Sequence, residues 1–284
     1  MSRVKQPTAT LLLVIAASLS VAAAAPPRAR RPVAVAVARD GTIVIADAAL
    51  PGIVRRGPDG TISEVFRASN QHRAPLRATR ALAIGTDGGI LAADSASSEV
   101  YRLEAGRDPA PIAAGSFEVP TGLAVAEDGS IVVADLRLDL VGRVPKGGGA
   151  TATIATVVAP RAVAIDRDGS VVVLAMRGDQ LIRLDAEGRP QPIVRGRPFR
   201  LPLALLADGD RFLVSDGDAA TIFAVARSGQ VTPFVRGAPL VRPAGLARDH
   251  DGSLLVADPG AGQVFRVSQD GAVRLLLDSP APAR

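Results

Sequence analysis

The sequence predicts an all-β fold, a six-bladed β-propeller with four antiparallel strands in each blade, on the basis of three observations. The first is a repeat: an apolar stretch such as "GLAVAEDGSIVVAD" at residues 122–135 recurs about every 40 residues. The second is an Asp-Gly dipeptide inside the stretch, and the third is a set of four short apolar runs in each unit. About 40 residues and four strands are the dimensions of a propeller blade.

The first strand of each unit alternates large and small residues, as a strand with two different faces does. Its small position is Ala in all six units, and the preceding residue is always Val or Leu. A small residue retained in every copy indicates crowding near a central axis, so we expect these strands to line a channel. The column is Ala36, Ala83, Ala124, Ala164, Ala204 and Ala247.

An Asp-Gly turn joins the first strand to the second, because Gly supplies the positive φ that a tight hairpin requires. Five units have it, at Asp40, Asp87, Asp128, Asp168 and Asp251, while unit five reads Asp208-Gly209-Asp210. The predicted blades span about 32–70, 78–115, 119–157, 159–196, 200–237 and 242–279. No unit is split between the two ends of the chain, so we expect the ring to close by packing of blade one on blade six.

Residues 1–25 have the pattern of a signal peptide, with Arg3 and Lys5 ahead of an apolar core and a small-residue cleavage zone. Residues 26–31 form a short segment before the propeller, which spans 32–279. The chain has no Cys and therefore needs no oxidising compartment for disulfides. We expect a periplasmic or secreted protein of a bacterial envelope, monomeric, with no stable membrane span after cleavage; an uncleaved signal would leave it anchored.

Composition excludes some classes of partner. The formal net charge is +5, but only two of the 33 basic residues are Lys, an imbalance better explained by codon composition than by nucleic-acid binding. There is no Trp and only one Tyr and seven Phe. Sites that stack sugars or bases need aromatic faces, so the sequence predicts no nucleic-acid partner.

Two complete units carry a family resemblance: "PTGLAVAEDGSIVVADLRLDLVGRV" at 120–144 and "PAGLARDHDGSLLVADPGAGQVFRV" at 243–267. They resemble the units of NHL-repeat propellers, and the resemblance extends over about 32–279. The Asn-His or Asn-Arg pair that commonly follows the Asp of those units is absent here. The resemblance implies a six-bladed ring that binds a ligand or a protein through its loops. The chain is more distantly similar to the gluconolactonase-like propellers.

An Asp ends the second strand of five units, and each should lie toward the face that holds the second-to-third loops and the fourth-to-first connections, here named the loop face. These residues are Asp47, Asp94, Asp135, Asp216 and Asp258, with Ala175 in unit four. One interpretation is a repeated turn cap that accepts backbone N–H bonds. The other is a divalent cation site, Ca²⁺ for example, at the channel mouth.

The gluconolactonase-like resemblance implies three metal ligands: a Glu ahead of an inner strand, an Asn entering a later one and an Asp ending a second strand. Only the Asp has candidates here. Arg31 and Pro32 occupy the Glu position, and Thr121, Arg161 and Ala244 occupy the Asn positions. The sequence therefore indicates no required cofactor and favours a protein that is not an enzyme, with a metal-dependent hydrolase or lyase as the alternative.

Arginine follows two patterns. One Arg lies on the third strand of five blades, and we expect each to pair with a neighbouring carboxylate; the column is Arg55, Arg102, Arg143, Arg183 and Arg266. Other arginines gather in the loop-face connections, where acids are scarce, and predict an anionic ligand or an unknown protein partner. The candidate binding residues are Arg73, Arg77, Arg80, Arg161, Arg200 and Arg242. Alternatively, these arginines only balance the Asp carboxylates of the same face.

Histidine offers no acid–base pair, because His72 falls in a loop-face insertion and His250 beside a hairpin of the opposite face. No Ser-His-Asp arrangement or phosphate-binding loop is legible. The sequence thus predicts an exported NHL-type propeller that acts as a binding or interaction module through its loop face.

Overall fold

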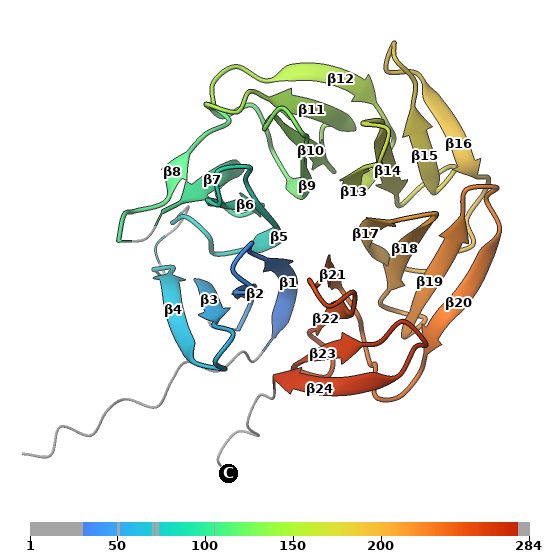
Figure 1. Ribbon diagram of the computed structural model, residues 1–284. Coiled ribbons are helices and arrows are strands. Elements are labelled where there is room, and N and C mark those ends of the chain that lie inside the picture. The colour runs from blue at the N-terminus through green and yellow to red at the C-terminus, as the bar shows by residue number, and fades with distance from the viewer. Residues whose placement is uncertain (1–30, 50–51, 70, 72–73, 105, 278–284) are drawn as a thin grey trace, which may run out of the picture.

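The computed structural model describes residues 31–49, 52–69, 71, 74–104 and 106–277, and these form a six-bladed β-propeller (Figure 1). Each blade is one antiparallel sheet of four strands that follow each other in chain order, with the first strand innermost. The fold class predicted from the sequence is confirmed. None of the described residues forms a helix that could cross a membrane. The signal peptide predicted at residues 1–25 lies outside the described residues.

The blades have these bounds. Blade one has β1 (Pro32–Val37), β2 (Ile43–Asp47), β3 (Gly52–Arg56) and β4 (Ile62–Arg67); blade two has β5 (Thr79–Ile84), β6 (Ile90–Asp94), β7 (Glu99–Leu103) and β8 (Ala110–Pro111). Blade three has β9 (Pro120–Val125), β10 (Ile131–Asp135), β11 (Leu140–Val144) and β12 (Ala152–Thr156); blade four has β13 (Pro160–Ile165), β14 (Val171–Ala175), β15 (Leu181–Leu184) and β16 (Pro190–Val194). Blade five has β17 (Pro202–Asp208), β18 (Arg211–Asp216), β19 (Thr221–Ala226) and β20 (Val231–Arg236); blade six has β21 (Gly245–Arg248), β22 (Leu254–Asp258), β23 (Gln263–Val267) and β24 (Val273–Leu277).

The Asp-Gly hairpins have the predicted geometry. Gly129 has a φ of 82°, and the Asp128 carboxylate accepts the N–H of Ser130 at 2.9 Å. The same bond, from Asp to the residue two places on, recurs at Asp40, Asp87, Asp168 and Asp251. These turns lie on the face opposite the loop face, named here the hairpin face.

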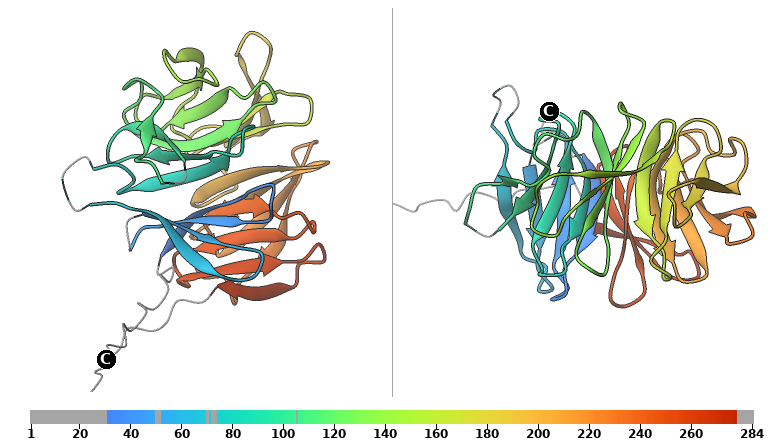
Figure 2. Two further views of the ribbon diagram at one scale, coloured as in Figure 1. Left: turned by 60° about the vertical axis from the view of Figure 1, so that its left-hand side comes forward. Right: turned by 90° about the horizontal axis from the view of Figure 1, so that it is seen from above.

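Blade one closes the ring by packing on blade six. Ile45 and Val54 lie in one buried cluster with Leu255 and Val264. Among the described strands, those of blades one and six belong to separate sheets. A Cβ at Gly245 would lie 2.7 Å from the Cα of Ala34, so only Gly allows the two inner strands to approach so closely. Face packing therefore closes the ring, as expected. Seen from the side, the blades stand next to one another around the axis (Figure 2).

A β-bulge interrupts the inner strand of five blades close to the loop face. The register between the first and second strands shifts by one residue, for example between Pro160 and Ala162 in blade four. The residue that the shift leaves without a partner is named here the bulge position, and it is Val33, Arg80, Thr121, Arg161 or Leu203. A bulge turns a side chain away from the regular alternation of the strand, so these five residues can differ without changing the repeat.

Candidate functional site

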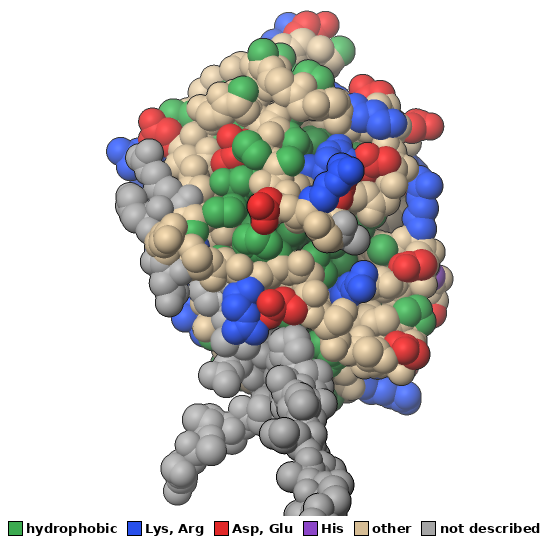
Figure 3. Space-filling model, turned by 90° about the vertical axis from the view of Figure 1, so that its left-hand side faces the viewer, with side chains coloured by type: hydrophobic (Ala, Val, Ile, Leu, Met, Phe, Trp, Pro, Cys, Tyr) green, Lys and Arg blue, Asp and Glu red, His purple; other side chains and the backbone are tan. Residues whose placement is uncertain are grey.

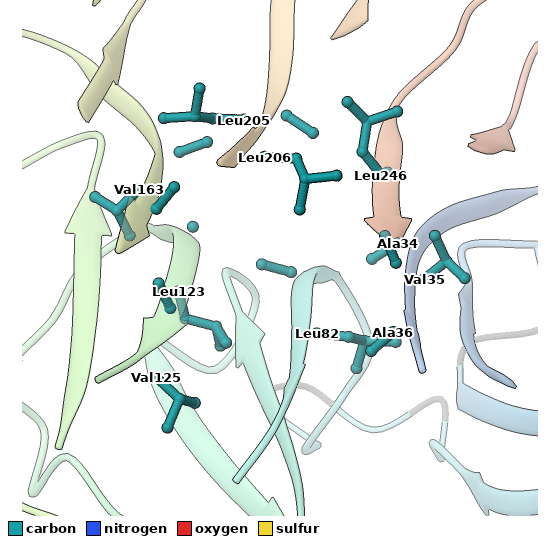
Figure 4. A pocket seen from close by; sticks show the side chains of 18 of the residues that line it. Ala34, Val35, Ala36, Leu82, Leu123, Val125, Val163, Leu205, Leu206 and Leu246 are labelled. Atoms are coloured by element: carbon teal, nitrogen blue, oxygen red, sulfur yellow. The ribbon is translucent and has the colours of Figure 1, made fainter. Parts of the chain in front are cut away.

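A channel of about 430 Å³ runs between the inner strands (Figure 4). Five of the six Ala positions of the inner-strand column line it, as the crowding argument predicted; Ala83 does not. The channel wall is apolar apart from Arg80, Thr121 and Arg248. The inner strands thus form a hydrophobic tube with charge only toward its ends.

At the loop face the channel opens into a second pocket of about 470 Å³, in which four arginines converge. Arg80 and Leu203 belong to the walls of both spaces, so the pocket and the channel are continuous. We name this space the arginine pocket. Its lining residues are Arg31, Val33, Arg80, Arg161, Leu203, Arg242, Ala244, Pro259 and Gly260.

The local structure explains why these arginines meet. Arg80 and Arg161 each occupy the bulge position of their inner strand, where the side chain leaves the alternation of the sheet and enters the channel mouth. Arg31 immediately precedes β1, and Arg242 lies in the connection from β20 to β21. The site is therefore formed by blades one, two, four and six together.

The arginine pocket carries uncompensated positive charge. Among the described residues, no carboxylate lies within ion-pair distance of Arg31, Arg80 or Arg161. Arg80 donates from Nε to Ser95 Oγ at 2.9 Å, and Arg161 donates to the Thr121 carbonyl at 3.3 Å. Both acceptors are neutral. Within the described residues, these guanidinium groups therefore lie in one pocket with no carboxylate partner.

The charge state of Arg161 reflects this environment. Part of its surface remains open to the channel mouth, but its guanidinium lies deep among protein atoms. Burial, and then the positive charge of Arg80, lower the pKa of Arg161 to about 10. The guanidinium is still charged at neutral pH, so its burial and the repulsion from Arg80 cost the folded protein free energy. Arg242 has only a loose, exposed ion pair with Asp218 at 3.6 Å.

The Asp residues that end the second strands hold the loop-face backbone. Asp135 is fully buried and accepts four N–H groups, from Glu118 and Val119 at 2.7 and 2.9 Å and from Arg137 and Leu138 at 2.9 and 3.0 Å. Each carboxylate thus clamps the connection arriving from the preceding blade as well as its own loop. Asp47, Asp94, Asp216 and Asp258 are also buried and bond to the same two segments.

These hydrogen bonds agree with the turn-cap interpretation and extend it to a link between blades. Within the part of the chain that the structure describes, no three His, Cys, Asp or Glu side chains are placed to hold a metal ion. In blade four, Ala175 replaces the Asp, and Asp139 of blade three accepts the Ala159 N–H of the arriving connection at 2.7 Å. The buried Gln180 holds the connection that leaves blade four. Its amide donates to the Phe199 carbonyl at 3.1 Å and accepts the Phe199 N–H at 2.8 Å.

The third-strand arginines lie at the hairpin face and serve the blades. Three pair with carboxylates as expected: Arg102 with Asp87, Arg183 with Asp166 and Asp168, and Arg266 with Asp249 and Asp251. The other two bond to hydroxyls: Arg55 to Ser63 and Arg143 to Ser130. In blades four and six, Arg183 and Arg266 also bond to Ser170 and Ser253, in addition to their carboxylates.

The hairpin-face mouth of the channel is neutralised by ion pairs. Asp166 is buried, with Arg227 and Arg183 bonded to its carboxylate. Asp208 pairs with Arg211 at 2.9 Å and with Arg248, which lines the channel. The Asp166–Arg227 pair joins blade four to blade five, and the Asp208–Arg248 pair joins blade five to blade six. The hydrogen bonds of Asp166, that from Arg227 first, lower the pKa of its carboxyl far below the usual range.

Three of the predicted binding residues, Arg80, Arg161 and Arg242, are brought together in the arginine pocket. Arg77 and Arg200 do not line it; Arg77 donates to the Gln71 carbonyl instead. Arg73 lies outside the described residues. Arg31 lies at the position of the Glu metal ligand in the gluconolactonase-like propellers, and it is not among the binding residues predicted from the sequence.

The outer side of the ring shown in Figure 3 has a different character, since acidic and basic side chains are interspersed over it. Exposed ion pairs on blades one and two include Arg67 with Glu64 and Arg107 with Glu104. The outer side in Figure 3 thus shows both signs of charge, whereas the charged side chains that line the arginine pocket are all Arg.

Solved structures of other propellers share this architecture. Virginiamycin B lyase from Staphylococcus aureus matches with a TM-score of 0.68 at 16% identity, over 89% of this chain and 86% of that one. A gluconolactonase from Xanthomonas campestris gives 0.70 at 17%, over 88% and 87%. The nidogen/laminin complex gives 0.63 at 16%, over 84% and 89%.

These likenesses establish the fold. The neighbours of this six-bladed propeller include gluconolactonase-like propellers, a lyase and the NHL-type propeller of nidogen and laminin. They thus comprise enzymes as well as a propeller in a protein complex, and at these identities they do not choose between those roles. No family model and no curated protein sequence matches the chain.

Proposed function

We propose that the protein is a binding module that holds an anionic ligand in the arginine pocket of its loop face. The observation that carries the proposal is the convergence of Arg31, Arg80 and Arg161 without a carboxylate partner among the described residues. Like charges at close range cost free energy in the empty protein. A bound anion removes that cost and gains charge-assisted hydrogen bonds from the same groups.

The positions of the arginines support binding over metal-dependent catalysis. The gluconolactonase-like resemblance implies a Glu ligand where this chain has Arg31 and Pro32, and an Asn ligand at a position held here by Thr121, Arg161 or Ala244. Arg31 and Arg161 line one pocket. Two positive side chains at ligand positions repel a cation and attract an anion, and the nearby Asp carboxylates already accept backbone N–H bonds.

Lyase chemistry finds less support. One lyase structure with the same architecture is of a catalytically inactive histidine-to-alanine variant. In this chain, His250 lies at the hairpin face, where a ring nitrogen is 2.9 Å from the Ala38 carbonyl. His72 lies outside the described residues. We place the binding module outside the cytoplasm, periplasmic or secreted, because of the predicted signal peptide.

Inorganic phosphate is a suitable probe for this proposal, because its oxygens match guanidinium donors and it has no apolar part. The measurement is thermal unfolding of residues 26–284 at increasing phosphate and constant ionic strength, because salt screens charge. At 100 times its Kd, phosphate should stabilise the fold by about 2.7 kcal/mol, which is a rise in Tm of roughly 5 to 10 °C in a domain of this size.

Two variants make the test specific. Arg161→Met keeps an unbranched apolar stem and removes the charge, so it should lose most of the phosphate effect. Arg236→Met removes an exposed loop-face charge that lies outside the pocket and should keep it. An equal response of the wild type and both variants would reject the arginine pocket as the site.

A further inference from the structure

The channel behind the arginine pocket has the character of a site for an apolar group. Leu82, Leu123, Leu206 and Leu246 line it from four different blades (Figure 4). Aliphatic cavities of about 150 Å³ stay free of water and take up small apolar molecules. A channel of about 430 Å³ is large enough for a longer one.

The apolar channel continues directly from the positively charged arginine pocket. On β5, Arg80 lies at the mouth while Leu82 and Ile84 follow along the wall. Four residues of strand cover about 13 Å at roughly 3.3 Å each. An extended alkyl chain with C–C bonds of about 1.5 Å advances roughly 1.25 Å per carbon, so about ten carbons fit between the mouth and the far end.

An ion pair lies at the hairpin-face end of the channel. Arg248 forms part of the channel wall there, pairs with Asp208 and donates to the Gly252 carbonyl at 2.8 Å. An alkyl group that passed this point would remove water from an ion pair, which is costly. The channel therefore fits a single tail of limited length, entered from the loop face.

We infer that the ligand is a single-tailed amphiphilic anion, with an oxyanion head among Arg31, Arg80 and Arg161 and an aliphatic tail in the channel. The inference rests on the proposed anion-binding function and adds the tail to it. Charge complementarity fixes the orientation, because the other mouth offers arginines that are already paired with Asp166 and Asp208.

The test is a calorimetric series of straight-chain alkanoates, from butanoate to tetradecanoate, each below its micelle-forming concentration. Each methylene buried in the channel should lower Kd roughly four-fold. The gain should continue to about ten carbons and then level off. The 1-alkanol of equal length should bind at least ten-fold more weakly, and Arg161→Met should bring the acid close to the alcohol.

A channel variant separates tail from head. Leu206→Trp fills the channel, so it should abolish the gain from long tails and leave phosphate binding intact, while the nearly isosteric Leu206→Met keeps both. If Leu206→Trp does not fold, the chain-length dependence of alkanoate binding to the wild type, compared with that of the 1-alkanols, tests the proposal without it.

The outcomes separate the two proposals. An affinity independent of chain length, with phosphate still bound, overturns the amphiphilic ligand and leaves the anion-binding function. Acids and alcohols that bind equally in wild type and in Arg161→Met overturn both. Binding of neither phosphate nor any alkanoate also overturns both.

Discussion

The two mouths of the channel use the same residue type in opposite ways. At the hairpin face, Arg227 and Arg248 are matched to the carboxylates of Asp166 and Asp208. At the loop face, Arg80 and Arg161 meet without such partners in the described residues. The first arrangement joins blades to one another, whereas the second costs stability in the empty protein. An arginine that the fold does not need, and that costs it free energy, is more readily explained by a ligand.

The largest effect that distinguishes the mouths is expected at Asp166. Asp166→Asn leaves Arg183 and Arg227 without their buried acceptor and should destabilise the protein by about 3 kcal/mol, a fall in Tm of roughly 6 to 12 °C. Calorimetric or circular dichroism melting measures this. A change below about 0.5 kcal/mol would show that the hairpin-face pairs do not stabilise the ring.

The pH dependence of the stability of Asp166→Asn tests whether the charge of Asp166 is what stabilises the fold. Because the pKa of Asp166 is lowered on folding, its charge stabilises the fold above the usual carboxyl pKa of about 4 and this contribution declines as the pH falls further. The stability difference between wild type and Asp166→Asn should therefore narrow below about pH 4. A difference that widened there would contradict the ion-pair origin of the effect.

The opposite sign is expected at the other mouth. Arg161→Met removes a charge whose pKa the fold lowers to about 10, so it should stabilise the ligand-free protein by about 1 kcal/mol. Urea unfolding without added anion measures it, with Arg236→Met expected to change stability by less than about 0.5 kcal/mol. Destabilisation by Arg161→Met, to the extent seen at Asp166, would make the two mouths equivalent.

Alkaline titration tests the same charge more finely. An arginine with a folded pKa below its unfolded value opposes folding while it is charged in both states. That cost is relieved as the pH rises above about 10, toward the higher pKa of an unperturbed arginine. The advantage of Arg161→Met over wild type should therefore shrink between about pH 9 and pH 11. Parallel stability curves across this range would argue against a strained Arg161.

No effect is expected from metal ions. Thermal unfolding of residues 26–284 should be the same in EDTA and in Ca²⁺, Mg²⁺, Mn²⁺ or Zn²⁺, because the Asp clamps already bond to backbone N–H groups. A cation at 100 times its Kd would add about 2.7 kcal/mol instead. Such a rise, lost in Asp135→Ala or Asp216→Ala, would favour the metal-dependent hydrolase or lyase.

The sequence was sufficient for the fold because each structural need recurs in every unit. The Asp-Gly turn occurs in five units and the inner-strand Ala in all six, and this repetition distinguishes both features from chance matches. Ring closure by blades one and six followed from the absence of a split unit. The bond that holds the connection into blade four did not follow, because its acceptor, Asp139, comes from a loop of blade three.

The site was harder to predict because it depends on orientation. Arg80, Arg161 and Arg242 were selected for their place in loop-face connections, but Arg200 met the same criterion and points elsewhere than the pocket. Arg80 and Arg161 differ from Arg200 in lying at a β-bulge, a one-residue shift in strand register that the amino-acid sequence did not predict. Arg31 was recognisable only through its position ahead of the first inner strand.

The bulge position also makes the scaffold adaptable. Along one short ring of residues the chain carries Val33, Arg80, Thr121, Arg161 and Leu203, whereas the Ala column beside it never varies. Because a bulged residue has no partner in the ladder, exchanging it leaves strand pairing intact. A library restricted to these five codons would vary the charge and shape of the channel entrance on an unchanged propeller, which makes the ring a natural starting point for designing new small-molecule receptors.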